Sequence, residues 1–146
     1  MIKKLLGFFQ QQAQQTESRK PELAAAALLV EIMNADHEIS LEESVSIKQI
    51  LVETLLIDPN VADQLLENAQ QEVSAANDLF QFTEVINASY SYPEKVRLLE
   101  SLWQVAYSDQ HLDKYEEHMI RRIADLLYVS HSDFIQTKHR IKAAQE

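Results

Sequence analysis

The stretch that decides the fold is LLESLWQVAYSDQHLDKYEE, residues 98–117. Its apolar residues recur at the spacing of one helix face, and the apolar run ends at a short polar turn. Asp113 then stands where a helix cap is expected, with Glu116 three residues later. The stretch therefore predicts two helices joined by an acidic turn.

The same junction occurs earlier in the chain as LLVEIMNADHEISLEES, residues 28–44, and the two align without gaps at an offset of 73 residues. Apolar matches carry little weight, because any two amphipathic helices align in this way. The polar matches are more specific, and they pair Asp36 with Asp109, Ser40 with Asp113, and Glu43 with Glu116. The repeat predicts two helix–turn–helix halves related by a pseudo-twofold axis.

Composition supports an all-α fold for the whole chain. Its 146 residues suit one domain, and they include one glycine and three prolines, too few for the turns of a typical β-sheet protein. We expect an irregular bundle of seven to eight helices in residues 21–146, preceded by an amphipathic helix and polar linker in residues 1–20. The expected helix starts are Pro21, Ser40, Asp58-Pro59, Ser74 or Asn77, Pro93, Asp113 and Ser130.

Charge and cysteine content exclude several functions. A formal net charge of −10 argues against nucleic-acid binding, which depends on neutralising phosphates with lysine and arginine. The chain has no cysteine, and so it has no disulfide, thiolate ligand or cysteine nucleophile. No apolar run approaches the roughly 20 residues that span a bilayer. Since we find no obvious nucleophile or phosphate-binding loop, we predict a protein without enzymatic activity.

The first nine residues form a separate short amphipathic pattern, MIKKLLGFF. We consider three interpretations: packing on the protein's own domain or on a second copy, contact with a membrane surface or partner, and a disordered tail. Lys3 and Lys4 beside the apolar stripe favour the membrane surface, although a short face with two lysines binds membranes weakly. The stripe consists of Ile2, Leu5, Leu6 and Phe9.

The acidic residues of the two junctions are candidate ligands for a divalent cation. If the halves pack about a twofold axis, both Asp–Glu pairs approach one another, and a cation would relieve their repulsion. Oxygen ligands favour Ca²⁺, Mg²⁺ or Mn²⁺, whereas a histidine ligand would favour Zn²⁺. The main candidates are Asp36, Glu43, Asp109 and Glu116, and further candidates are Glu38, His111 and Asp113.

The junctions do not have the pattern of an EF-hand. That loop needs glycine at its sixth position and a bidentate glutamate at its twelfth. With Asp36 or Asp109 as the first position, the sixth position is Leu41 or Lys114, and the twelfth is Ile47 or Ile120. Any cation site at these junctions must therefore use a different geometry.

A purely structural interpretation explains many of the same residues. Ser40 and Glu43 have the spacing of a capping box, and Asp113 is a good helix cap. Glu116 in the first turn of a helix is also favoured by the helix dipole. Capping and cation binding are compatible, because a carboxylate that shapes a turn can also hold an ion.

The junction motif resembles that of the tellurite-resistance protein B (TerB) family. The pattern is (Ala/Ser)-Asp-x-x-(Ile/Leu)-x-x-x-Glu, present as ADHEISLEE at residues 35–43 and as SDQHLDKYE at residues 108–116. The resemblance spans about residues 22–140. Many members have glycine after the aspartate, where this chain has His37 and Gln110.

This resemblance implies an all-α fold and a duplicated acidic surface proposed to bind divalent metal. It also implies a bacterial stress-associated role, a cytoplasmic location at the inner face of the membrane, and no enzymatic activity. We therefore predict a module that binds a divalent cation within a complex with a protein partner at the membrane surface. The alternative is a metal-free protein–protein interaction module that uses its acidic surface.

Overall fold

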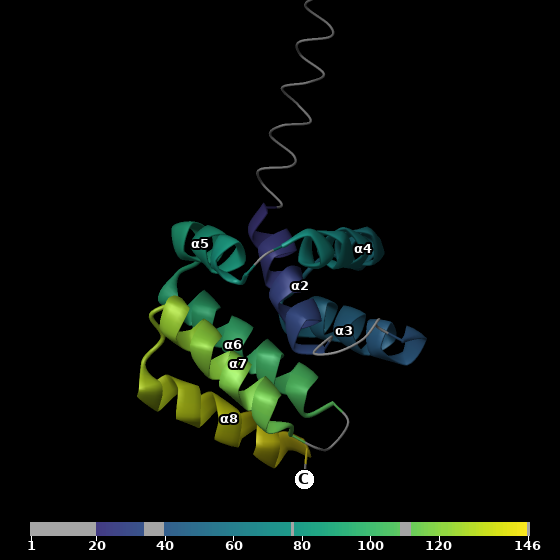
Figure 1. Ribbon diagram of the computed structural model, residues 1–146. Helices are drawn as coiled ribbons and strands as arrows, with labels where there is room; N and C mark the ends of the chain where they lie inside the picture. Colours follow the sequence, from purple (N-terminus) through teal and green to yellow (C-terminus); the bar gives the residue numbers. More distant parts are fainter. Residues whose placement is uncertain (1–19, 34–39, 77, 109–111, 146) are drawn as a thin grey trace, which may run out of the picture.

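A computed structural model describes residues 20–33, 40–76, 78–108 and 112–145, which form seven α-helices and no strand (Figure 1). This confirms the predicted all-α fold. The N-terminal segment and the turn residues Asp36, Glu38, Asp109 and His111 lie outside the described residues. The helices are α2 (Lys20–Met33), α3 (Leu41–Glu53), α4 (Pro59–Ala75), α5 (Phe80–Ser89), α6 (Tyr92–Ala106), α7 (Lys114–Leu126) and α8 (His131–Gln145).

Helix α2 lies at the centre of the bundle. It contacts α3, α4, α5, α6 and α7, and every residue from 24 to 30 is at most 3% exposed. Four consecutive alanines at residues 24–27 are buried, so the neighbouring helices pack against small side chains there. A helix that is apolar all round is expected to be buried on every side. Figure 1 shows α4 and α5 flanking its N-terminal half.

Trp103 of α6 joins the core to α8. Its side chain is fully buried, and its indole Nε1–H donates a hydrogen bond to the Thr137 hydroxyl at 3.0 Å. That hydroxyl in turn donates to the backbone carbonyl of Phe134 at 2.9 Å. Tyr107 lies one turn after Trp103, with a ring-centroid distance of 6.1 Å. The two aromatic residues therefore belong to the core and do not form an exposed binding platform.

Most helix starts follow the predicted capping chemistry. The Ser40 hydroxyl accepts from the Glu43 amide at 3.2 Å, and Glu43 Oε1 accepts from the Ser40 amide at 3.0 Å, which completes the capping box. Asp58 caps α4, Asp113 caps α7, and the Ser130 hydroxyl accepts from the backbone of the first turn of α8. These caps are local, and so the sequence alone predicts them.

Of the two predicted starts for the helix that follows α4, Ser74 is wrong. Helix α4 continues through Ala75, and Ser74 lies inside it with its hydroxyl donating to the Gln70 carbonyl at 3.0 Å. The first amide of α5, that of Phe80, instead donates to Asp78 Oδ1 at 2.9 Å. The other predicted cap, Asn77, lies outside the described residues.

Helix α6 begins one residue before the predicted Pro93. Ser91 and Glu94 form a second capping box, with Glu94 Oε1 accepting from the Ser91 amide at 2.8 Å. The signal was present in the sequence as serine followed three residues later by glutamate. The proline merely occupies the first turn, where its missing N–H has no cost.

Packing between the helices agrees with two related halves. The first half contributes α2 and α3, and the second half contributes α6 and α7. Helix α2 contacts α6, α3 also contacts α6, and α7 also contacts α2. Each half therefore places its second helix against the first helix of the other half, as a pseudo-twofold arrangement requires.

Three apolar residues of α3, α7 and α8 are exposed, although each stands near the apolar side of its helix. Val45 of α3 is 59% exposed, Tyr115 of α7 is 51% exposed, and Ile135 of α8 is 36% exposed. Periodicity identifies the apolar side of a helix but not how much of that side another element covers. These positions lie at the margins of their apolar faces.

Candidate functional site

A cavity of ≈ 290 Å³ lies where the two halves meet at their junctions. Residues from α2, α3, α6 and α7 contribute to its wall, although the two junctions are far apart in the chain. Its lining residues are Met33, Glu42, Glu43, Ser46, Val105, Ser108 and Glu116. The described part of the chain thus brings together two predicted ligands, Glu43 and Glu116.

The capping box of α3 positions Glu43. Its Oε1 accepts the Ser40 amide, which fixes the carboxylate beside the first turn of the helix. A carboxylate has two oxygens and several lone-pair directions, so this bond does not exhaust its capacity to bind a cation. Glu43 is half-buried, whereas its neighbour Glu42 is exposed at the rim of the same cavity.

The start of α7 positions Glu116. Asp113 Oδ1 accepts the Tyr115 amide at 3.1 Å and thereby fixes the first turn that carries Glu116. Glu116 is half-buried in the cavity wall. Asp113 is exposed, and it serves as the helix cap rather than as one of the described lining residues.

The adjacent Glu117 has a structural role. Its Oε1 accepts from Lys138 Nζ of α8 at 2.6 Å, and the same ammonium lies 5.9 Å from the centre of the Trp103 ring. This pair connects α7 to α8 over the buried indole. Glu117 therefore differs in surroundings from Glu116, although both stand in the first turn of α7.

The described residues that line the cavity make it acidic. Glu42, Glu43 and Glu116 contribute carboxylates, and the described lining includes no lysine or arginine. The positive ends of α3 and α7 compensate part of this charge, because acidic side chains in a first helical turn interact favourably with the helix dipole. A cation entering the cavity would meet only acidic or uncharged side chains among these lining residues.

Two of the lining residues directly precede the segments that carry the remaining predicted ligands. Met33 immediately precedes residues 34–39, and Ser108 immediately precedes residues 109–111. Both Met33 and Ser108 line the cavity. The turn residues themselves, with the predicted ligands Asp36, Glu38, Asp109 and His111, lie outside the described residues.

Among residues 20–33, 40–76, 78–108 and 112–145, no group of three or more His, Asp or Glu side chains is arranged to hold a metal ion. Glu43 and Glu116 alone therefore make an incomplete ligand set. Ser46 was not predicted to belong to the site. It lies one helical turn after Glu42, and nothing in the sequence distinguishes it from other serines on the polar side of a helix.

Comparisons with known proteins give one match. The family model for tellurite resistance protein TerB matches residues 22–139, a span that includes both junctions and nearly all of the described helices. No curated protein and no solved structure gives a significant match to the chain. Of the helices that the structure describes, none has the length and apolar character needed to cross a membrane.

Proposed function

The chain belongs to the TerB family, and from this membership and its cavity we propose that it is a non-enzymatic module that binds a divalent cation. The cation lies between the two helix–turn–helix halves. Its ligands are Asp36, Glu43, Asp109 and Glu116. Glu38 and His111 are further ligand candidates, whereas Asp113 already caps α7.

One observation supports this proposal: Glu43 and Glu116, one from each half of the bundle, line a single cavity. Asp109 directly follows the lining residue Ser108 in the sequence. Asp36 follows the lining residue Met33 by three positions. Carboxylates gathered in this way repel one another, and a divalent cation removes that repulsion.

The donor atoms select the class of cation. Carboxylate oxygens suit Ca²⁺, Mg²⁺ and Mn²⁺, and a contribution from His111 would shift the preference toward Zn²⁺. Binding joins the turn between α2 and α3 to the turn between α6 and α7. We propose that the cation thereby fixes the relative position of the two halves within a stress-associated complex with a protein partner in the cytoplasm, at the membrane surface.

Calorimetric titration of metal-stripped protein with Ca²⁺, Mg²⁺, Mn²⁺ and Zn²⁺ tests the proposal. Binding heat should appear with at least one ion and disappear in Asp36→Asn/Asp109→Asn. Glu43→Gln/Glu116→Gln should weaken binding while keeping the α3 cap, because glutamine also completes a capping box.

A matched control removes the same two charges elsewhere. Glu67→Gln/Asp125→Asn changes exposed carboxylates on α4 and α7 that do not line the cavity. This variant should bind the ion as the unmodified protein does. If it loses binding to the same extent as Asp36→Asn/Asp109→Asn, the effect is one of net charge and the proposed site is wrong.

A second candidate function is a metal-free protein–protein interaction module. The observation that favours it is the exposed start of α3, where Leu41 is 83% exposed and Val45 is 59% exposed beside the acidic Glu42. An apolar and acidic surface of this kind suits a basic amphipathic partner segment. Its binding should weaken with salt and with Leu41→Ser/Val45→Ser, and should be unaffected by chelator.

A further inference from the structure

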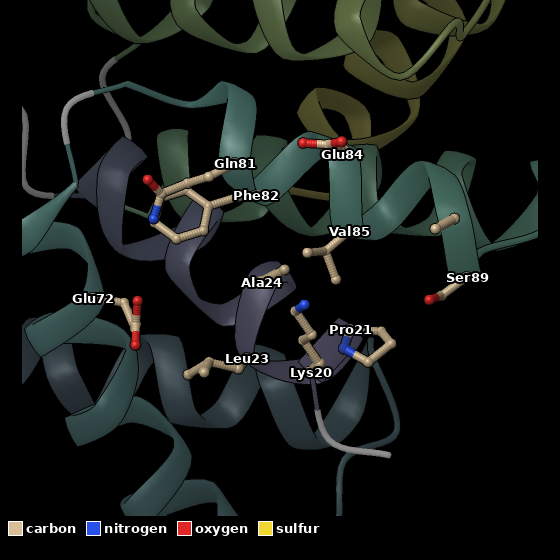
Figure 2. Close-up of a pocket in the computed structure, with 11 residues that line it drawn as sticks. Lys20, Pro21, Leu23, Ala24, Glu72, Gln81, Phe82, Glu84, Val85 and Ser89 are labelled. Atoms are coloured by element: carbon tan, nitrogen blue, oxygen red, sulfur yellow. The ribbon is translucent and has the colours of Figure 1, made fainter. Parts of the chain in front are cut away.

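A groove lies between the N-terminal end of α2, the end of α4 and α5, at the opposite end of α2 from the acidic junctions (Figure 2). Its volume is ≈ 1070 Å³. Leu23 and Ala24 of α2 and Phe82 and Val85 of α5 supply apolar wall. Leu23 and Val85 are only partly buried, although both pack against the core.

We propose that this groove is the docking site for the chain's own residues 1–9. Four of the apolar side chains of that segment, Ile2, Leu5, Leu6 and Phe9, fall on one stripe at helical spacing. In the docked state this stripe covers the partly buried side chains of Leu23 and Val85. The apolar stripe and the apolar groove thereby remove each other's surface from water.

The connection along the chain favours this occupant. Residues 1–19 lie outside the described residues, and the first described residue, Lys20, itself lines the groove together with Pro21. A nine-residue helix is about 13.5 Å long. Residues 10–19 can extend over at most about 36 Å, which allows the chain to turn back and place the stripe in the groove.

Charge also favours this occupant. Glu72 of α4 and Glu84 of α5 stand on opposite sides of the groove, as Figure 2 shows, and both are exposed. Lys3 and Lys4 flank the apolar stripe and carry the opposite charge. Lys20 contributes one positive charge at the end where the segment enters, which leaves the groove acidic by one unit.

A segment of the same chain has an advantage over a separate partner. A short linker gives the tethered stripe a local concentration in the millimolar range, so even a weak groove is occupied. A second copy of the chain reaches that concentration only in very concentrated solution. Occupancy by the chain's own segment is therefore independent of protein concentration, and this property separates the two occupants experimentally.

Amide hydrogen exchange on the full-length chain tests the proposal. Amides of residues 1–9 should be protected to the same degree at all protein concentrations. Val85→Glu, which puts a charge into the groove wall, should accelerate their exchange about tenfold. The control Val45→Glu makes the same change at an exposed position on α3 and should leave the exchange unaltered.

The charge contribution has its own test. Glu72→Lys/Glu84→Lys should reduce the protection about threefold, and the reduction should shrink in high salt. Glu67→Lys/Asp125→Lys makes the same change in net charge at exposed residues outside the groove. That control should retain the protection of the unmodified protein.

A variant of the segment keeps the test valid if Val85→Glu destabilises the domain. The substitutions Leu5→Ser/Leu6→Ser change residues outside the described domain and should shift the methyl resonances of Leu23 and Val85, whereas Leu41→Ser on α3 should not shift them. The proposal is overturned if residues 1–9 exchange at the rate of an unfolded peptide or if Val85→Glu has no effect. Protection that rises with protein concentration would show that the stripe binds a second copy of the chain. Protection that requires added phospholipid vesicles would show that it binds a membrane. Either result also overturns the proposal.

Discussion

Glu43 and Glu116 line the same cavity, although 73 residues of chain separate them and each stands in the first turn of its own helix. The relationship arises because α2 and α6 pack against each other and end near one another. Anything that binds both side chains is therefore bound to both halves of the bundle.

Binding of a cation here should stabilise the whole domain. For an ion at about one hundred times its dissociation constant, the free energy of unfolding should rise by about 2.7 kcal/mol. Thermal unfolding followed by circular dichroism measures this as a rise in Tm that chelator reverses. In Asp109→Asn the rise should be much smaller at the same ion concentration, and an undiminished rise would place the ion elsewhere.

The Ser40 cap should influence both stability and cation affinity. Ser40→Ala removes the hydroxyl that accepts the Glu43 amide and should cost about 1 kcal/mol of unfolding free energy. It should also weaken cation binding, because Glu43 loses its fixed position. Ser91→Ala breaks the equivalent capping box of α6 and should cost a similar free energy while leaving cation affinity unchanged.

Ser74→Ala provides the matched control for these two variants. Ser74 lies within α4, where its hydroxyl bonds to a carbonyl of its own helix, and alanine has the higher helix propensity. Chemical denaturation should show unchanged or slightly higher stability. If Ser40→Ala lowers stability without changing cation affinity, the prediction is wrong. The capping box then does not position Glu43 for cation binding.

The hydrogen bond between Trp103 and Thr137 should be important for the attachment of α8. Both side chains are buried, so Thr137→Val leaves the indole N–H without an acceptor and should cost about 1–3 kcal/mol. Thr137→Ser keeps the hydroxyl and should cost less than Thr137→Val. Urea denaturation measures both values, and the reverse order would mean that the methyl group matters more than the hydrogen bond.

Glu31 should make stability depend on pH. Burial raises the pKa of its carboxyl above the ordinary value, so the folded chain holds this proton more tightly than the unfolded chain. Protonated Glu31 therefore contributes to the stability of the fold. This contribution is complete below the pKa of Glu31 in the unfolded chain, and it is lost as the pH rises through its pKa in the folded chain. Glu31→Gln should therefore stabilise the domain at pH 7 and give little gain at acidic pH.

Comparison with Glu67→Gln isolates this effect. Glu67 is exposed on α4, and its replacement should change stability little at either pH. The difference in unfolding free energy between Glu31→Gln and the unmodified protein should grow between acidic and neutral pH. A difference that is constant across that range would assign the effect of Glu31 to packing rather than to its charge.

The local features of this fold could be predicted from the sequence. Ser40 with Glu43 and Asp113 before α7 depend only on residues within four positions of each other, and both caps are confirmed. The all-α class follows from composition and periodicity. The Ser91–Glu94 capping box has an equally local signature, although the neighbouring Pro93 gives a competing prediction for the helix start.

Features that depend on packing between distant elements could not be predicted in the same way. The repeat suggested that Glu43 and Glu116 approach each other, but only the contact between α2 and α6 brings both to one cavity. Helical spacing placed Val45 and Tyr115 on apolar faces, yet no spacing rule tells where a covering helix ends. Residues of three helices, α2, α4 and α5, form the groove beside Leu23, so the sequence of any one helix does not predict it.

The burial of α2 also has a mechanical consequence. The N-terminal segment joins the domain at Lys20, the first residue of α2, and from Ala24 onward this helix is buried. A tension applied to the first residues would act along the axis of a helix that five others surround. Such a force would therefore act first on the centre of the bundle and not on a peripheral helix.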